Sequence, residues 1–293
     1  ETIKSIKYNA PRDYSAQDRA VTSDDYKVLV KSLYANAQSV QVYGGEDAAV
    51  PDYGKVYISI KAKSGSNLTE VTKVSLVRSL KSFAVASVTP VIIDPETTFI
   101  TLTTTFKYDS SLTTKDISTL QTNVINSISS YNTDTLENFT GMFRYSAVGQ
   151  VIDGADTSIL SNITKIKMYK YITPTLNSGL KYTLSFNNAF YNPHSGHNAS
   201  AGGIVSSTGF KISGDDTNEH FLDDDGTGNV RTYYLSGTTR IYTDSSYGTI
   251  DYTTGEIILT SANITSVSNV DGATSTQVRV TVTPNSNDVV PVR

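Results

Sequence analysis

The 293-residue chain contains no cysteine and no tryptophan. Without cysteine it can form no disulfide framework, no thiolate nucleophile, no iron–sulfur cluster and no zinc site built on thiolates. No stretch approaches the ~20 apolar residues of a transmembrane helix, and the start has no signal-peptide pattern, so we expect no membrane insertion. The first residue is glutamate, and we therefore expect a fragment of a longer protein.

Charge is also sparse. Only 18% of the residues are charged, and 24 basic against 28 acidic residues leave a net charge of −4. This mild acidity offers no basic surface of the kind that nucleic-acid binders carry, so we expect no nucleic-acid partner. Tyrosine, with 19 residues, outnumbers phenylalanine, with 9, and suits half-buried β surfaces and polar contacts between proteins.

The chain divides by charge near Pro174. Up to Thr173 there are 18 basic and 17 acidic residues, whereas from Pro174 onward there are 6 basic and 11 acidic. Helical periodicity is readable in the first part and almost absent from the second. We therefore predict an N-terminal arm and capped helix over residues 1–35, an α+β domain over 36–173, a β-rich domain over 174–283 and a C-terminal tail over 284–293.

Three helices are predicted in the first part. The first covers residues 24–34 and follows a capping-box pattern. The second covers residues 68–84, with Asn67 as its cap and a wide apolar face that predicts deep burial. The third covers residues 114–131, and its single apolar stripe predicts that it lies on a sheet. That stripe consists of Ile117, Leu120, Val124, Ile128 and Tyr131.

Strands are predicted between these helices. The last two alternate apolar and polar side chains, which is the period of a half-buried strand. Asp94-Pro95-Glu96 is a turn signal at which the third and fourth strands meet. The order of strands and helices predicts an α+β fold, with helices on one face of a mixed sheet. The strands are residues 40–43, 55–62, 89–94, 97–108 and 163–172.

After Pro174 turn signals recur about every eight to twelve residues, which predicts a mostly antiparallel β domain, either a sandwich or a barrel. The stretch Tyr247–Leu259 reads as a hairpin whose short loop, Thr253–Gly255, ends in a glycine that can take a positive φ. The candidate strands are residues 182–186, 209–212, 231–235, 239–242, 248–252, 256–259 and 277–283.

Two loops carry possible ion ligands. His194 and His197 could bind zinc with His220 or an aspartate as a third ligand, but the surrounding Asn, Ser and Gly suit two solvated imidazoles equally well. The stretch Asp223–Asn229, "DDDGTGN", has oxygen ligands spaced as in a calcium loop, but no distal glutamate and no flanking helices. We interpret the first as a flexible loop and the second as a solvated hairpin tip, and expect no metal and no cofactor.

No catalytic set is visible in the sequence. It has no G-x-S-x-G, no glycine-rich phosphate loop and no H-E-x-x-H. A glycosidase needs two carboxylates at a fixed separation, and nothing in the sequence pairs its many acidic residues. We therefore expect no catalytic residues and a protein that is not an enzyme.

One stretch near the start is more specific: "NAPRDYSAQDRAVTSDDYKVLV", from Asn9 to Val30. In it an Ala-Pro pair leads to Arg-Ala-Val-Thr and then to a helix with Asp-Tyr in its first turn. This order resembles the signature of the baseplate J-like family, the wedge proteins of contractile phage tails. The polar, tyrosine-rich texture and the segment "GTIDYTTGEI" are similar to the large wedge proteins of T4-like phages. The signature positions are Ala10, Pro11, Arg19, Ala20, Val21, Thr22, Asp25 and Tyr26.

The signature residues also have a local physical interpretation. Pro11 is expected to hold the preceding alanine in an extended conformation. Thr22 is expected to cap the first helix, with Asp25 reaching back as in a capping box. Arg12 and Arg19 can pair with carboxylates, either on a neighbouring subunit or within their own domain, and the sequence leaves both possibilities open.

The resemblance implies a structural virion protein of the tail baseplate, assembled in the host cytoplasm. Family members of the T4 type are homodimers that link neighbouring wedges into a ring, contact other wedge subunits, and rearrange before the tail contracts. The signature residues would then be scaffold, and rigid domains would move about linkers such as Thr173–Pro174. The alternative is a receptor- or glycan-binding β-rich domain of the tail-fibre type, which predicts a concave patch of Tyr, Asp and Asn. A hydrolase would instead show a cleft with perturbed titratable groups.

Overall fold

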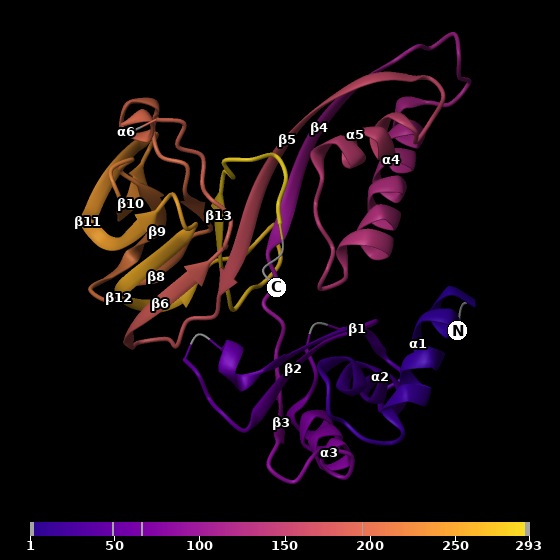
Figure 1. Cartoon of the computed structure of the whole chain (residues 1–293). Helices are drawn as coiled ribbons and strands as arrows, with labels where there is room; N and C mark the ends of the chain where they lie inside the picture. The colour runs from indigo at the N-terminus through magenta and orange to yellow at the C-terminus, as the bar shows by residue number, and fades with distance from the viewer. Residues whose placement is uncertain (1–2, 49, 66, 195, 291–293) are drawn as a thin grey trace. The chain divides into compact units, whose positions relative to one another are not determined.

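The computed structural model describes residues 3–48, 50–65, 67–194 and 196–290, and these divide into two compact units (Figure 1). The first unit takes in the described residues up to Glu96 together with Asn132–Gly141. The second takes in Thr97–Tyr131 and the described residues from Met142 onward. The chain thus first passes from one unit to the other after Glu96, and the predicted seam at Thr173–Pro174 lies within the second unit.

The first unit combines helices with a mixed three-stranded sheet. The strand order is β1-β2-β3, with β1 and β2 antiparallel and β2 and β3 parallel. Helix α2 packs on β1 and α3 on β3, and Val30, Ile58 and Leu80 are fully buried between them. The elements are α1 (Ile3–Ala16), α2 (Ser23–Leu33), β1 (Ala37–Gly44), the 3-10 helix η1 (Gly45–Asp47), β2 (Lys55–Ala62), α3 (Glu70–Lys81), β3 (Thr89–Ile93) and the π-helical turn η2 (Asn132–Leu136).

The first predicted helix is confirmed. Helix α2 begins at Ser23, directly after Thr22, and both halves of the predicted capping box are present. Its buried residues are Tyr26, Val28, Leu29 and Val30. Local hydrogen bonds and apolar spacing agree here, so the sequence alone was sufficient.

The start of the second predicted helix is wrong. Helix α3 begins at Glu70, and its cap is Thr69, whose hydroxyl accepts a hydrogen bond from the N–H of Thr72 at 3.4 Å. Asn67 lies outside the helix and does not cap it. Asparagine and threonine are similar in cap preference, so residue type alone could not decide between them.

The burial expected for this helix is also wrong. Val71 and Val74 are 81% and 58% exposed, whereas Leu76 and Leu80 are buried. The wide apolar set therefore includes residues on the solvent side of α3. Only the side of α3 that faces the sheet is covered, and sequence hydrophobicity does not report which side that is.

The extended entry expected at Ala10–Pro11 is wrong as well. Both residues lie within α1, with Pro11 in the helix interior. An interior proline typically costs about 3 kcal/mol of helix stability because it removes a backbone hydrogen bond. Helix α1 packs against α2, and this tertiary contact outweighs the local preference of the residue before proline. The helix ends where Gln17 and Asp18 take positive φ angles of 49° and 57°.

The second unit contains a four-stranded antiparallel sheet in the order β4-β5-β13-β7. Strand β5 alternates as predicted, because Ile166 and Met168 are buried while Lys165 and Lys167 are exposed. Helix α5 packs on β5, and α4 packs on α5 (Figure 1). Helix α4 was predictable from its apolar stripe, whereas α5 was not predicted. The elements are β4 (Phe99–Tyr108), α4 (Ile117–Tyr131), α5 (Tyr145–Asp153), β5 (Ile159–Ile172), β7 (Ser206–Ser207) and β13 (Val278–Val282).

The turn signal at Asp94–Glu96 does not join two strands of one sheet. Strand β3, before it, runs parallel to β2 in the first unit, and β4, after it, pairs with β5 in the second. The strands assigned to one mixed sheet therefore belong to two sheets. The mixed sheet is the three-stranded one, with α2 and α3 packed on it.

The rest of the second unit is a small antiparallel barrel. Pairing runs β11-β10-β9-β8-β12, and β12 pairs again with β11, so the ring of strands closes, while β6 adds to β12 (Figure 1, orange). Two predicted strands are parts of one long β11, and β9 was missed because its sequence, "DDTNEHFLDD", is highly charged. The elements are β6 (Gly179–Ser185), α6 (His197–Ala201), β8 (Phe210–Ile212), β9 (Asp215–Asp224), β10 (Asn229–Ser236), β11 (Thr239–Asp251) and β12 (Glu256–Val267).

The predicted hairpin between β11 and β12 is confirmed. Asp251 pairs with Glu256 across its loop, and Gly255 has a φ of 72°. A β-carbon at Gly255 would lie 2.0 Å from the carbonyl oxygen of Asn188. Glycine is therefore required here both by the backbone angle and by the close approach of another segment.

The predicted fold class, α+β, is confirmed by the mixed sheet, the two antiparallel sheets and the helices packed against them. In the described part of the chain no helix combines the length and the apolar character that crossing a bilayer requires.

Candidate functional site

The signature segment forms the junction of α1, α2 and α3. Ala20 is buried, and its N–H donates to the carbonyl oxygen of Phe83 at 2.8 Å, just after α3. The hydroxyl of Thr22 accepts from the N–H of Asp25 at 3.3 Å, and the Asp25 carboxylate accepts from the N–H groups of Thr22 at 2.8 Å and Val21 at 3.1 Å. These contacts tie the segment to its own unit.

The protonation of Asp25 reflects this geometry. Partial burial raises the pKa of the Asp25 carboxyl, but the hydrogen bonds from the backbone of Thr22 and Val21 and from the Thr22 hydroxyl outweigh it, so the pKa lies below its ordinary value. The carboxylate is thus charged at neutral pH, at the N-terminal end of α2, where the helix dipole also favours a negative charge.

The remaining signature side chains lie at the surface. Val21 is 66% exposed. Arg19 donates to the Oε1 of Gln17 at 3.1 Å, and the Nε of Arg12 is 4.0 Å from the carboxylate of Asp24. Both arginines therefore contact their own unit, but only Arg12 does so through a carboxylate, since the partner of Arg19 is an amide oxygen. A subunit contact made by these signature positions stays a prediction.

The three histidines do not come together. His194 and His197 lie 3.2 Å apart, from Nε2 to Nδ1, with their rings at right angles. His220 lies on β9, is fully buried, and has its Nε2 3.6 Å from the carboxylate of Asp215. Among the residues that the structure describes, no group of three or more His, Cys, Asp or Glu side chains is placed to hold a metal ion.

The stretch Asp223–Asn229 forms the turn end of the β9–β10 hairpin, as interpreted from the sequence. The expected solvent exposure is wrong for Asp223 and Asp224, which are 3% and 0% exposed. The Asp225 carboxylate at its tip accepts from the N–H groups of Thr227 at 2.7 Å and Asn229 at 3.0 Å, and from the Asn229 side chain at 2.7 Å. Burial raises the pKa of Asp225, but these hydrogen bonds lower it well below its ordinary range. The oxygens that a calcium ion would use are thus engaged in shaping the turn.

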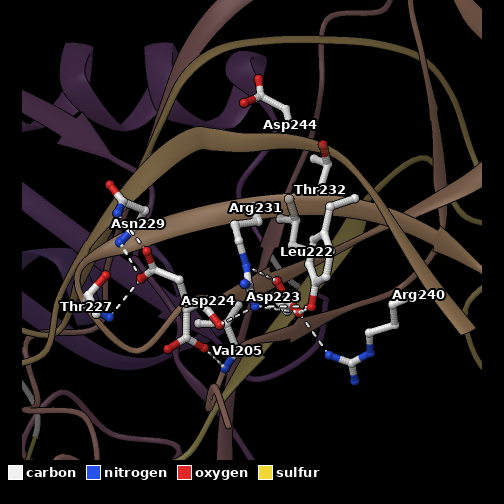
Figure 2. Close-up of polar contacts among 12 residues, drawn as sticks. Val205, Leu222, Asp223, Asp224, Thr227, Asn229, Arg231, Thr232, Arg240 and Asp244 are labelled. Carbon is white, nitrogen blue, oxygen red and sulfur yellow. Dashed lines mark hydrogen bonds and ion pairs between the residues drawn. The ribbon is translucent and has the colours of Figure 1, made fainter. Parts of the chain in front are cut away.

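Asp223 is the centre of a buried polar network (Figure 2). It accepts hydrogen bonds from Arg231 at 3.0 and 3.1 Å, from Arg240 at 2.8 Å and from the Tyr242 hydroxyl at 2.9 Å. Each guanidinium also lies over a tyrosine ring: Arg231 at 4.3 Å from the centroid of Tyr242, and Arg240 at 4.6 Å from that of Tyr233. The network ties β9, β10 and β11 together.

The partners of Asp223 were not predicted from the sequence, because the register of the hairpin is not fixed by the residues of its tip. A hairpin tip over Asp223–Asn229 would, counted symmetrically, set Asp223 opposite Asn229, whereas the structure sets Asp223 opposite Arg231. The contributions of Arg240 and Tyr242 come from the next strand, and no local pattern indicates them.

Asp224 has a different set of partners (Figure 2). Its carboxylate accepts from the N–H groups of Ile204 at 2.6 Å and Val205 at 2.8 Å, and from the Tyr252 hydroxyl at 2.6 Å. Burial and the adjacent Asp224 carboxylate both raise the pKa of Tyr252 far above its ordinary value. Asp224 thus holds the loop before β7 and the β11–β12 turn against the barrel.

An open hollow of about 410 Å³ lies beside the loop that follows β4. Its charged groups pair with each other, since the Nζ of Lys115 is 2.6 Å from the carboxylate of Asp156. The Lys115 ammonium and the N–H and hydroxyl of Ser158 lower the pKa of Asp156 to about 2. No tyrosine lines this hollow, in contrast to the concave Tyr, Asp and Asn patch expected of a glycan binder. Its lining is Ser111, Leu112, Thr113, Thr114, Lys115, Asp156 and Thr157.

One face of the β4–β5 pair is open to solvent. Thr101 on β4 lies beside Lys167 on β5, and Thr103 lies beside Lys165, all four being exposed. At one end of this face Phe99 stacks on Tyr169, with ring centroids 5.0 Å apart. We call this the β4–β5 outer face, and it consists of Phe99, Thr101, Thr103, Thr105 and Lys107 on β4 and Ile163, Lys165, Lys167, Tyr169 and Tyr171 on β5.

Comparison with known proteins assigns two regions of the chain. Residues 22–93 match the family model described as baseplate structural protein gp6, C-terminal domain I, and residues 96–171 match that of C-terminal domain III. The boundary between the two matches coincides with the passage from the first compact unit to the second. The baseplate wedge protein gp6 of Enterobacteria phage T4 is 30% identical over 188 residues, which cover 62% of this chain and 28% of that protein.

These matches refine the resemblance derived from the sequence. The models that match are those of gp6 C-terminal domains, and the assignment to the baseplate J-like family is not confirmed by them. The second match ends at residue 171, close to the seam predicted at Thr173–Pro174. The chain spans little more than a quarter of the length of the T4 protein.

Proposed function

Since the matched regions make the chain a member of the gp6-like family of baseplate structural proteins, we propose that it is a wedge component of the baseplate of a contractile phage tail. In this role it forms a homodimer, links neighbouring wedges into a ring, and contacts other wedge subunits. It is assembled in the host cytoplasm and acts in the virion. The observation that carries the proposal is the pair of family matches, which meet where one compact unit gives way to the other.

The chemistry of the described residues supports a mechanical role. The Asp223 network, the Asp224 contacts and the Asp25 cap use their charged groups to hold strands and helices in place. Buried polar networks whose members are fully hydrogen-bonded rigidify the unit that holds them. A protein that transmits force between neighbours needs such rigid parts.

The division into two units supports a rearrangement. The chain passes between the units after Glu96 and on both sides of Asn132–Gly141. Hinges are a few residues that absorb changes in backbone angle between rigid parts. On this proposal the passages, rather than the interior of either unit, change conformation when the baseplate changes shape.

The test is the mass of the purified chain in solution. The chain has a mass of 31.7 kDa, and multi-angle light scattering over a micromolar concentration series is expected to approach twice that value. A mass that stays at the monomer value over the whole series contradicts dimerisation by this part of the protein. The glycan-binding alternative predicts a monomer that is retained on a glycan surface, so the same preparation distinguishes the two.

A further inference from the structure

Strand β4 is an unprotected sheet edge. It lies at one end of the order β4-β5-β13-β7 and pairs with β5 along its whole length, from Phe99 opposite Tyr169 to Tyr108 opposite Ile159. Within the described residues its backbone has no hydrogen-bond partner other than β5. Its outer edge therefore presents a row of N–H and C=O groups that can pair with another strand.

The other free edges in the described part of the chain are shorter or protected. Strand β7 has two residues, and β3 has five, one of which is Pro90. Strand β1 has eight residues and a register shift between Ala37 and Ser39, and the side chains of Gln38 and Ser39 contact the 132–141 segment. Strand β6 has seven residues and carries Gly179 and, at its third position, Lys181.

Strand β4 has none of these protections. Its ten residues, "FITLTTTFKY", contain no proline, no glycine and only one charge, Lys107 near the end. Its ladder with β5 is regular up to a shift between Lys107 and Tyr108. Natural edge strands of this length usually carry a proline, a bulge or a central charge that prevents pairing. Strand β4 lacks all three features, so nothing in its sequence prevents another strand from pairing with its free edge.

We propose that β4 pairs with β4 of a second copy, antiparallel and about a two-fold axis at Thr103, so that two four-stranded sheets become one. This deepens the proposed function and rests on its homodimer. A two-fold antiparallel pair sets residue i opposite residue j with a constant sum, and the outward backbone groups meet only when that sum is even. With Thr103 on the axis, every residue from Phe99 to Lys107 is paired, which is the full regular stretch.

The side chains fit this register on the β4–β5 outer face. Thr103 meets its own counterpart, and Thr101 meets Thr105 of the second copy. Phe99 meets Lys107 of the second copy, where an ammonium and an aromatic ring attract each other. Directly opposed threonines form favourable cross-strand pairs, and no two like charges face each other. The strand is therefore complementary to itself, which is what an isologous contact requires.

The opposite face fits as well. The same register sets Ile100 against Phe106 of the second copy and Leu102 against Thr104. Ile100, Leu102 and Phe106 are half-buried in the single chain, so pairing would cover the remaining apolar surface of each. Burying apolar area in this way stabilises association.

The lysines of β5 do not oppose the arrangement. Lys165 lies beside Thr103, so the two copies of Lys165 would be separated by three strand spacings, about 14 Å. This distance exceeds the Debye length of about 8 Å at physiological salt, and the repulsion is largely screened.

A single-cysteine scan tests the proposal, because the native chain has no cysteine. We expect Thr103→Cys to form a disulfide-linked dimer on mild oxidation at least about tenfold faster than Thr101→Cys or Thr105→Cys, since only the residue on the axis brings two sulfurs within bonding distance. An equimolar mixture of Thr101→Cys and Thr105→Cys should cross-link where neither alone does. Thr249→Cys is the control, because Thr249 is exposed but its strand is paired on both sides.

Charge reversal provides a second measurement that does not depend on oxidation. Thr103→Lys and Thr103→Glu each place like charges on the axis and should raise the dimer dissociation constant roughly two- to fivefold, whereas their mixture should restore the parent value. Thr103 is exposed, so circular dichroism should show both variants folded.

The outcomes separate this proposal from the one on which it rests. A chain that is dimeric in light scattering, but whose β4 cysteines react no faster than Thr249→Cys, overturns the β4 pairing and leaves the homodimer intact. A fastest reaction at Thr101→Cys or Thr105→Cys overturns the axis at Thr103. A chain that stays monomeric overturns both proposals.

Discussion

Asp223 and Arg231 lie directly opposite each other on β9 and β10, and their side chains meet at two points, Nε to Oδ1 at 3.0 Å and Nη2 to Oδ2 at 3.1 Å. The Asp223 side chain is only 4% exposed. A two-point contact between a guanidinium and a buried carboxylate is stronger and more directional than a single hydrogen bond. We conclude that this pair sets the register of the hairpin and anchors the barrel.

Removing the carboxylate of Asp223 should destabilise the second unit markedly. Asp223→Asn keeps the shape but leaves Arg231 and Arg240 without their shared counter-charge, and we expect a loss of about 2–4 kcal/mol. Urea denaturation followed by circular dichroism measures it. Arg240→Ala is the matched control, because Arg240 is 53% exposed and its removal should cost below about 1 kcal/mol. Equal losses for the two variants would show that Asp223 is not the centre of the network.

Asp156 should make the stability of the second unit depend on pH in the acid range. Its pKa is lowered to about 2 from 3.8 by Lys115 and Ser158. A carboxyl with a depressed pKa in the folded state contributes its full stabilisation above pH 3.8 and loses it as the pH falls through about 2. We therefore expect the melting temperature to fall more steeply between pH 4 and pH 2 in the parent chain than in Asp156→Asn.

Lys115, the partner of Asp156, provides the control for the fall in melting temperature between pH 4 and pH 2. Lys115→Met removes the largest cause of the lowered pKa but leaves the hydrogen bonds from Ser158. The steepness in this variant should be intermediate between the parent and Asp156→Asn. If the melting temperature of the parent and of Asp156→Asn depends on pH in the same way, another group causes the loss of stability in acid.

Two tyrosines of the barrel should respond differently to the loss of their hydroxyl groups. The Tyr252 hydroxyl donates to the buried Asp224 carboxylate at 2.6 Å, so Tyr252→Phe leaves a charged acceptor short of a donor and should cost about 1–3 kcal/mol. The buried Tyr247 hydroxyl has no hydrogen-bond partner among the described residues, so Tyr247→Phe should be neutral within about 0.5 kcal/mol or stabilising. Urea denaturation of the parent and both variants measures the two changes in unfolding free energy.

Alkaline titration provides an independent check on Tyr247. Burial, with Asp244 and Tyr182 nearby, raises the pKa of Tyr247 to about 12. A raised pKa in the folded state means that the stabilisation is full below pH 10 and is lost as the pH rises toward about 12. Tyr247→Phe should therefore resist alkaline unfolding better than the parent. Equal alkaline midpoints would show that Tyr247 ionises like an exposed tyrosine.

Local features of this fold were predictable from the sequence because their partners lie within a few residues. The capping box joins Thr22 and Asp25, three residues apart. The β11–β12 turn needs the positive φ of Gly255, and the alternation of β5 follows from its pleat. Each of these signals can be evaluated without knowing the rest of the chain.

Features that depend on distant segments were not predictable in this way. Strands β3 and β4 are neighbours in sequence but join different sheets, because β3 finds β2 and β4 finds β5. Strand β13 returns to β5 after more than a hundred residues, so a change in composition at Thr173–Pro174 does not separate them. Pro11 lies in a helix because α2 supports it. In each case tertiary contacts outweigh local preference.

The candidate site was predictable to a similar extent. The tip of the β9–β10 hairpin was recognised from Asp223–Asn229, but the register that sets Arg231 opposite Asp223 was not. The roles of Arg240 and Tyr242 depend on the position of β11 beside β10. Strand β4 has a free edge because, among the described residues, no other strand of the sheet lies on its outer side. An unpaired edge is a property of the assembled sheet and has no signature within the strand itself.

The cap of α2 separates a local role of the signature from a role in assembly. Thr22→Ala removes the hydroxyl that accepts from the N–H of Asp25 at 3.3 Å, and we expect it to cost about 1 kcal/mol. Thr22→Ser keeps the hydroxyl and should retain most of the stability. Both variants should dimerise like the parent in light scattering, because the capping contacts lie within the first unit. If Thr22→Ser is as unstable as Thr22→Ala, the hydroxyl is not the cap, and if either variant loses the dimer while remaining folded, the signature takes part in assembly after all.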